Sequence, residues 1–359
     1  MGLAEHYSER IRKLQGALGE AGIEALWVDS SVNLVYLTGL ELLSLERLTG
    51  LVVPAEGELR TVVPLLLRDE LAIVDADHNA WTDSDGPEEA TAKALKGVSA
   101  LHVLGSLPVW AYDVLRNAGP SRIEIDYAVL AGLRERKDER EAEVLRRSGE
   151  ITDGILTWVT TLDLVGLSER VLGGRIRARY LEGGHSGADC LVATGANAAM
   201  PHYAGGDVPI DGSAPLLLDF GGVVDHYFSD MTRVLFPEAT SPEVLDVYGV
   251  VCDAYDAALA AVEPGVACHE VDRAARLVVE EAGHGEQFWH RTGHGLGLEV
   301  HEPPFLREGN ERTLEVGHVF SIEPGIYFPG RFGLRYENIV YLGPDGPLEL
   351  NRTPRRHAL

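Results

Sequence analysis

Residues 215–236 read PLLLDFGGVVDHYFSDMTRVLF, two β-rich runs around a glycine-containing turn. This pattern predicts a β-hairpin. If the turn is centred between Val224 and Asp225, Asp219 and Asp230 lie opposite each other, the first of them inside an apolar strand. Facing acids repel, and partial burial raises the cost unless a cation lies between them or one takes a proton. A turn centred elsewhere would leave one aspartate solvated, so this pair alone does not decide the matter.

A second hairpin with the same arrangement is predicted in residues 319–342, VFSIEPGIYFPGRFGLRYENIVYL. The turn signal Pro329-Gly330 lies midway between Glu323 and Glu337, so these acids should also face each other. One strand glutamate is usually a solvent-facing residue, but two such pairs on neighbouring hairpins are hard to explain without positive charge. Four carboxylates drawn together suit hard or borderline divalent ions, and two ions about 3.5–4 Å apart commonly neutralise such a site.

Histidines lie between the hairpins, where residues 289–306 read WHRTGHGLGLEVHEPPFL. A single histidine in a turn is more often a hydrogen-bonded structural residue than a ligand. The nearby acids nevertheless favour His294 as a ligand, since imidazole is the commonest nitrogen ligand of a catalytic transition metal. A phosphate site at these glycines is disfavoured because no helix start follows and the surroundings are acidic. His202, in AMPHYAGG, is uninformative by itself, and a turn histidine is the default interpretation.

Charge and composition restrict the classes of partner. The 359 residues carry a formal net charge of −25. This surplus repels polyanions, so neither nucleic acid nor an anionic membrane is an expected partner. The start of the chain has no signal-peptide run, and no later stretch approaches the roughly eighteen apolar residues of a membrane span. The three cysteines, Cys190, Cys252 and Cys268, are too scattered for a disulfide framework or a zinc knuckle, which favours a reducing cytoplasm.

The organisation of the chain predicts two domains. Up to residue 133, short apolar runs alternate with helical pieces, which is typical of a mixed α/β domain. The charged stretch RERKDERE at 134–141 is a candidate boundary, so we predict domains at 1–133 and 134–359. In the first, we expect a helix at 7–22 and apolar runs at 23–29, 51–54, 60–67, 72–74 and 101–104. In the second, we expect helices at 138–162, 168–181, 241–261 and 269–282, and strands at 190–194, 215–221, 227–236, 319–323 and 334–342.

Five segments resemble one known family in order and spacing: MPHYAG, LLLDFGGVVDHYFSDMTR, RTGHGLGLEVHE, SIEPGIYF and GLRYENIV. The family is that of the pita-bread metallopeptidases, which includes Xaa-Pro dipeptidase (prolidase) and aminopeptidase P. The likeness spans roughly residues 138–342, and the N-terminal part is similar to the family's creatinase-type N-terminal domain. It implies an α+β fold, with a C-terminal pita-bread (creatinase/aminopeptidase) domain after a smaller mixed α/β domain. Methionine aminopeptidase shares the catalytic fold but usually lacks that extra domain.

The resemblance also implies a metal centre. Its ligands would be Asp219, Asp230, His294, Glu323 and Glu337. Two divalent ions would share Asp230 and Glu337, with Asp219 on one ion and His294 and Glu323 on the other. Ligation by oxygens and one imidazole favours Mn²⁺, with Co²⁺ or Zn²⁺ as alternatives. Creatinase, a relative that hydrolyses its substrate without metal, lacks this ligand set, so its chemistry is disfavoured.

The activity that follows is exopeptidase cleavage of the Xaa-Pro bond by a hydroxide that bridges the ions. Glu323 would pass the proton of the water to the departing proline nitrogen. His202 and His301 would line the substrate site, where either could stabilise the tetrahedral intermediate, and Arg335 would support the metal shell. The expected substrates are proline-containing dipeptides, with aminopeptidase P activity on longer peptides as the close alternative. A catalytically dead peptide-binding module is the alternative from another class, and the resemblance favours a homodimer.

Selection of dipeptides requires a donor for the proline carboxylate, such as a guanidinium or a phenol. Phe305 occupies a position that is arginine in several prolidases, so another residue must supply the donor if dipeptides are favoured. The candidates are Arg331 at the hairpin tip, Tyr336 beside a ligand, and Arg47 in the loop SLERLTG, which could reach an active site across a dimer interface. Each is equally well explained as a surface or packing residue. Strand alternation also turns Tyr336 away from the face that bears Glu337.

Overall fold

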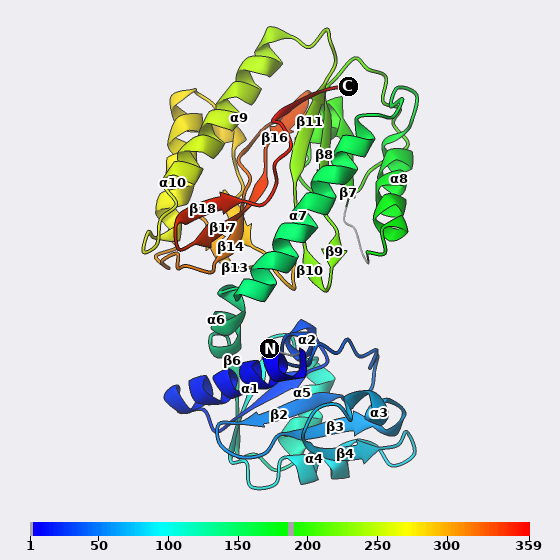
Figure 1. Ribbon diagram of the computed structural model, residues 1–359, viewed down its shortest axis with the longest axis vertical. Helices are drawn as coiled ribbons and strands as arrows, with labels where there is room; N and C mark the ends of the chain where they lie inside the picture. Colours follow the sequence, from blue (N-terminus) through cyan, green and yellow to red (C-terminus); the bar gives the residue numbers. More distant parts are fainter. Residues whose placement is uncertain (1–2, 186–189) are drawn as a thin grey trace. The chain divides into compact units, whose positions relative to one another are not determined.

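The computed structural model describes residues 3–185 and 190–359 (Figure 1). The chain divides into two compact units, Met1–Arg134 and Glu135–Leu359. None of the helices within the described ranges is both long and apolar enough to cross a membrane.

A six-stranded mixed sheet forms the centre of the N-terminal unit, in the order β4-β3-β2-β1-β5-β6. Its strands are β1 (Ala25–Asp29), β2 (Gly50–Pro54), β3 (Arg60–Pro64), β4 (Asp77–Trp81), β5 (Ala100–Leu104) and β6 (Arg122–Asp126). Its helices are α1 (Leu3–Glu20), α2 (Val32–Thr38), η1 (Leu65–Leu67), α3 (Arg68–Leu71), α4 (Glu88–Ala94), α5 (Val109–Asn117) and α6 (Val129–Glu135), the last of which reaches the next unit. The apolar run at 72–74 is a turn rather than a strand, and the edge strand β4 has the polar sequence DHNAW, which no apolar run marks.

The C-terminal unit contains a four-stranded sheet, β19-β11-β8-β7, and a five-stranded sheet, β13-β12-β14-β17-β18. Two further strand pairs, β9–β10 and β15–β16, are hairpins. The strands are β7 (Cys190–Thr194), β8 (Leu216–Phe220), β9 (Val223–Val224), β10 (Tyr227–Phe228), β11 (Thr232–Phe236), β12 (Gly293–Gly295), β13 (Glu302–Leu306), β14 (Val319–Ile322), β15 (Gly325–Phe328), β16 (Phe332–Arg335), β17 (Asn338–Gly343), β18 (Gly346–Glu349) and β19 (Arg356–Ala358). The helices are α7 (Glu139–Val159), α8 (Glu169–Glu182), η2 (Gly195–Ala199), α9 (Pro242–Ala260), α10 (Cys268–Glu281) and η3 (Gly285–Gln287).

Strand β8 separates two apolar cores because its successive side chains point to opposite faces. Leu217 packs in the core that contains residues of α9 and α10, whereas Leu216 and Leu218 pack in the core that contains residues of α7 and α8. Figure 1 shows the two helix pairs on either side of the strands. A strand buried on both faces is apolar nearly throughout, as the sequence LLLDF shows. Asp219, on the face of Leu217, is therefore a partly buried acid in an otherwise buried strand.

The charged stretch 134–141 is partly buried, although Arg136, Glu139 and Arg140 are exposed. Lys137 and Glu141 are 5% and 3% exposed. The Nζ of Lys137 lies 2.5 Å from Oε1 of Glu302, and Asp138 and Glu141 form a capping box that starts α7. Within this unit, Glu135 pairs with Arg312. Because buried charges are tolerated only when they are paired, these contacts fix the start of the C-terminal unit.

His318 lies beside this stretch as a buried neutral imidazole. Its Nδ1 accepts the backbone N–H of Glu315 at 3.1 Å, and its backbone bridges to Arg136. Burial lowers the pKa of His318 to about 4, against an opposing contribution from Glu315 and with help from nearby cations such as Arg312. The folded pKa is thus below that of an unfolded histidine. As pH falls, the unfolded chain takes up this proton first and folding is weakened.

We expect this histidine to cost about 2 kcal/mol of stability as pH falls from 7.5 to 5, because the unfolded histidine takes up its proton near pH 6.5 whereas the folded one does so only near pH 4. In His318→Asn the amide oxygen can accept the same N–H but does not titrate. Urea unfolding of metal-free protein at both pH values should show a larger acid-side loss in the wild type than in the variant. Equal losses would contradict the assignment.

Candidate metal centre

The first acidic hairpin differs in register from the sequence prediction. Asp219 pairs with Thr232, so the prediction that it faces Asp230 directly is wrong by two residues. The turn is formed by Asp225 and His226, which have positive φ angles of 48° and 72° between β9 and β10. A two-residue turn with both residues in the left-handed region matches the twist of the strands that it joins. Asp230 then lies diagonally from Asp219, on the same face of the hairpin.

The second hairpin has the predicted register. β14 pairs with β17 and β15 with β16, and both ladders continue to a pairing of Glu323 with Glu337. At these two residues the strands separate, and their backbone N–H groups donate to neighbouring segments instead of to each other. The N–H of Glu323 donates to the carbonyl of Thr292 at 2.7 Å, and that of Glu337 donates to the carbonyl of Thr232 at 3.3 Å. The two glutamates therefore connect the hairpin that carries the aspartates with the segment that carries His294.

His294 lies in β12, where the backbone passes close to β14. A Cβ on Gly293 would lie 1.9 Å from the carbonyl oxygen of Ser321, so no larger residue fits there without movement of the backbone. The N–H of His294 donates to Oγ of Ser321 at 3.0 Å, and its Nδ1 donates to the carbonyl of Gly295 at 3.1 Å. This bond leaves Nε2 as the atom that faces the acids.

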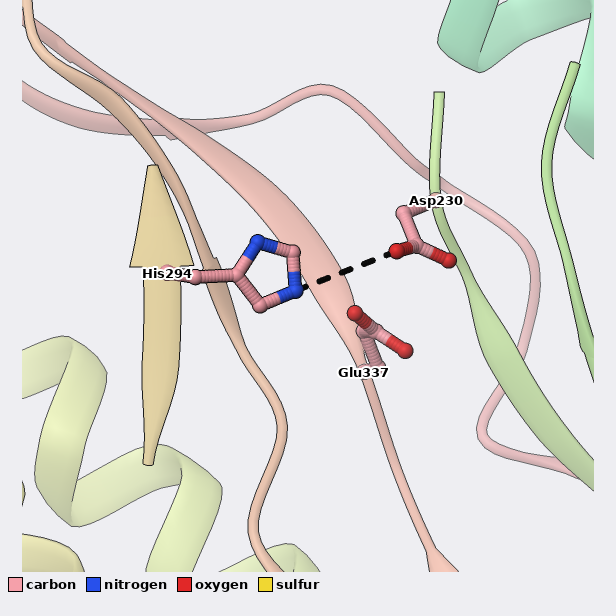
Figure 2. A group of neighbouring side chains, drawn as sticks. All are labelled: Asp230, His294 and Glu337. Atoms are coloured by element: carbon pink, nitrogen blue, oxygen red, sulfur yellow. Dashed lines mark ion pairs between the residues drawn. The ribbon is translucent and has the colours of Figure 1, made fainter. Parts of the chain in front are cut away.

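Three ligand-type side chains meet closely at this point. Asp230, His294 and Glu337 each offer an atom within 4.8 Å of the others, and Figure 2 shows the imidazole of His294 directed at Asp230 with Glu337 beside them. Nε2 of His294 lies 3.9 Å from Oδ2 of Asp230 and 3.2 Å from Oε1 of Glu323. Asp219 is held by Arg335, whose Nη2 donates to its Oδ2 at 2.5 Å.

The electrostatics of the cluster favour a bound cation. Burial, followed by the charges of Asp219 and Glu323, raises the pKa of Asp230 well above its usual value. Burial, followed by the charge of Asp230, does the same to Glu337. Oε1 of Glu337 is buried and has no hydrogen-bond partner among the described residues. An orphaned carboxylate oxygen beside other acids and an imidazole is a donor set that fits divalent metal ions.

A hydrogen-bond network behind the cluster fixes its orientation. Arg335 donates from Nε to Oγ1 of Thr232 at 2.9 Å and from Nη1 to the hydroxyl of Tyr327 at 2.7 Å. Thr232 in turn donates to Oε2 of Glu337 at 2.6 Å. The Tyr327 hydroxyl lies 2.9 Å from Nε2 of His290, whose Nδ1 donates to a backbone carbonyl. Burial raises the pKa of Tyr327 to about 12, so its hydroxyl keeps its proton.

Sequence reasoning placed Arg335 behind the ligands but missed Thr232, Tyr327 and His290. Thr232 carried a signal, since it lies two residues after one predicted ligand. The sequence gives no comparable signal for His290 and Tyr327, because their place in the hydrogen-bond network depends on contacts between distant segments.

All five predicted ligands line one cavity of about 730 Å³. His202 and His301 line it as well, and the rings of His294 and His301 meet edge to face with centroids 4.2 Å apart. Desolvation, with a smaller contribution from His294, lowers the pKa of His301 to about 4. His301 is therefore neutral at pH 7 and can donate one hydrogen bond without adding charge.

Comparison with known proteins assigns the family. Residues 143–344 match metallopeptidase family M24, and residues 10–126 match the creatinase/prolidase N-terminal domain. The chain belongs to metallopeptidase family M24. The probable dipeptidase PepE of Mycobacterium bovis is 36% identical, over 98% of this chain and 96% of its own.

Solved structures of other M24 proteins are similar over the whole chain. Dipeptidase PepE from Mycobacterium ulcerans is 35% identical, with a TM-score of 0.94 over 99% of this chain and 98% of that one. Recombinant prolidase from Thermococcus sibiricus is 34% identical, with a TM-score of 0.93 over 98% and 99%. The prediction of a pita-bread metallopeptidase with a creatinase-type N-terminal domain is confirmed.

Two of the three carboxylate-binding candidates, Arg331 and Tyr336, do not line the cavity of this M24 chain. Arg331 is exposed at the tip of the β15–β16 hairpin, where Nη2 pairs with Glu243 at 2.8 Å. Tyr336 is 3% exposed and packs edge to face on Tyr255 in the core, as strand alternation predicts. The third candidate, Arg47, pairs with Asp83 through two hydrogen bonds within the N-terminal unit, and its reach to a partner's active site across a dimer interface stays a prediction.

We expect Asp230→Ala to lose tightly bound divalent metal and activity, because it removes one of the three ligand-type side chains whose atoms lie within 4.8 Å of one another. Elemental analysis of purified protein measures this directly. Asp207→Ala, which removes an exposed carboxylate paired with Arg170, is the control and should keep its metal. Full metal content in Asp230→Ala would contradict the site.

Proposed function

We propose that this M24 metallopeptidase hydrolyses the peptide bond before proline and prefers dipeptides. The observation that carries the proposal is the convergence of five ligand-type side chains on one cavity whose wall also presents His202 and His301. The solved structure named prolidase, similar over nearly the whole chain, supports the same substrate class.

The proposed centre holds two divalent ions, with Mn²⁺ as the first choice. Asp230 and Glu337 would be shared, Asp219 would bind one ion, and His294 and Glu323 the other. Ions held there would polarise the scissile carbonyl and lower the pKa of a water molecule enough to supply a nucleophile near neutral pH. The donor set has four carboxylates and a single imidazole, which favours a hard ion.

The protein side chains would position the substrate and move protons. Glu323 is held by the Ser321 hydroxyl at 3.2 Å, and its pKa is lowered because His294, then His290 and Arg335, outweigh the effect of burial. A carboxylate ionised in this way can take a proton and return it to the departing proline nitrogen. That transfer is needed because proline leaves as a secondary amine.

His301 and His202 would hydrogen-bond the reacting carbonyl from the cavity wall. Arg335 would hold Asp219 in place rather than contact the substrate. The wall also presents apolar side chains suited to a pyrrolidine ring, which has no N–H to satisfy. These are Leu191, Phe220, Phe228 and Val300.

The proposal extends to the rest of the molecule. Residues 1–133 would form the creatinase-type domain and 134–359 the catalytic domain of a cytoplasmic homodimer. The three cysteines, Cys190, Cys252 and Cys268, are free thiols, which is compatible with a reducing compartment.

Substrate length is tested by comparing Ala-Pro with Ala-Pro-Ala at saturating Mn²⁺. We expect a higher kcat/KM for Ala-Pro, because a cavity of about 730 Å³ that already holds the catalytic groups suits a short substrate. A clear preference for the tripeptide would favour the aminopeptidase P alternative instead.

We expect His301→Ala and His202→Ala to keep their metal and to lower kcat on the order of 100-fold, the scale for loss of one transition-state donor. Steady-state kinetics with Ala-Pro, together with elemental analysis, separates the two effects. Wild-type turnover in either variant would assign that histidine a structural role.

A further inference from the structure

Arg291 presents a cationic side chain to the cavity three residues before the imidazole of His294. Its backbone is held on both sides. Its carbonyl accepts Nδ1–H of His290 at 2.7 Å, and the next residue, Thr292, donates both its N–H and its hydroxyl to Asp272 at 3.0 and 2.8 Å. The backbone from which the Arg291 side chain extends is therefore held in place on the cavity wall.

The guanidinium of Arg291 stacks on an aromatic ring, but its N–H groups have no hydrogen-bond partner among the described residues. Its central carbon lies 4.8 Å from the centre of the Phe305 ring, which orients the group without using its donors. No described residue pairs with it through a hydrogen bond or an ion pair, and the side chain is only partly exposed. Desolvation lowers the pKa of Arg291, and the charge of Glu323 acts in the opposite direction.

Arg335, the other arginine that lines the cavity, differs in this respect. It is 3% exposed, and its donors bond to Asp219, Thr232 and Tyr327. Among the described residues of the cavity wall, Arg291 is thus the arginine whose guanidinium has no hydrogen-bond or ion-pair partner in the protein and can give its donors to a ligand. Its charge also acts on His301, so it lies on the side of the cavity where the substrate is proposed to bind.

We propose that Arg291 binds the free α-carboxylate of the dipeptide and that Phe305 holds its guanidinium in place. This inference rests on the proposed function. A planar guanidinium forms paired, charge-assisted hydrogen bonds with a carboxylate, whereas a peptide amide at the same position offers one neutral oxygen. Arg291 therefore makes the cavity selective for a chain end and so for dipeptides.

The alternative is that Arg291 only packs on Phe305. Kinetics with Ala-Pro and alanyl-prolinamide distinguish the two, since these substrates differ only in the carboxylate. For Arg291→Gln we expect KM for Ala-Pro to rise about 10- to 100-fold, the scale of a lost charge-assisted bond, with kcat changed little. The constants for the amide should stay nearly unchanged. An equal loss on both substrates would overturn the proposal.

Arg307→Gln is the matched control, because it removes the same charge from an exposed arginine that bonds only the neighbouring carbonyl of Glu308 among the described residues. It should behave as the wild type on both substrates. Arg291→Lys keeps the positive charge but not the paired N–H donors of the guanidinium. It should therefore recover only part of the affinity for Ala-Pro that Arg291→Gln loses. Phe305→Leu should raise KM for Ala-Pro less than Arg291→Gln does.

Binding of the product gives a readout that does not depend on turnover. By calorimetry on the manganese-loaded enzyme, Kd for L-proline should rise at least 10-fold in Arg291→Gln and not in Arg307→Gln. Unchanged L-proline binding in Arg291→Gln would overturn the role of Arg291 alone. A wild-type enzyme that cleaves Ala-Pro-Ala but not Ala-Pro would overturn the dipeptidase proposal and this inference with it.

Discussion

The repulsion among buried carboxylates is the constraint on which the rest of the C-terminal unit depends. Asp230 and Glu337 have raised pKa values because burial and their acidic neighbours both disfavour their charge. Among the described residues of the cavity wall, one guanidinium is deeply buried, that of Arg335, and each of its three nitrogens donates a hydrogen bond. One cation cannot balance the remaining acids in a low-dielectric site. Metal binding and the stability of this region are therefore coupled, since the ions that provide Lewis acidity also relieve this repulsion.

Backbone hydrogen bonds between strands hold these carboxylates close enough to repel one another. The ladder between β14 and β17 opens at Glu323 and Glu337, and each freed N–H bonds to a different neighbouring segment. One bond reaches Thr232 beside the aspartate hairpin, and the other reaches Thr292 before the histidine strand. Because main-chain bonds set these positions, the ligand geometry is not left to flexible side chains alone. The same logic explains why Gly293, packed against Ser321, tolerates no side chain.

The sequence predicted those parts of the site that depend on local turns and alternation. The glutamate pair was predicted correctly because a Pro-Gly turn marks the centre of its hairpin. The aspartate register was wrong by two residues because the turn is formed by Asp225 and His226, where no glycine marks the two left-handed positions. Alternation also predicted that Tyr336 faces the core. The run at 72–74 failed as a strand signal, since its apolar residues follow a short helix.

Local turns and alternation do not predict contacts between distant segments. The residue proposed to bind the substrate carboxylate is an example. Its position at the hairpin tip made Arg331 a candidate in the sequence, but Arg331 pairs with Glu243 outside the cavity. Phe305 was read only as a missing arginine, yet its ring lies under the guanidinium of Arg291. An arginine on one segment that stacks on an aromatic residue of another can supply a charge that neither position reveals alone. Substrate specificity in such a cavity therefore depends on pairs of residues from different segments. The residue that binds the substrate carboxylate is the cation whose hydrogen-bond donors have no partner within the folded protein.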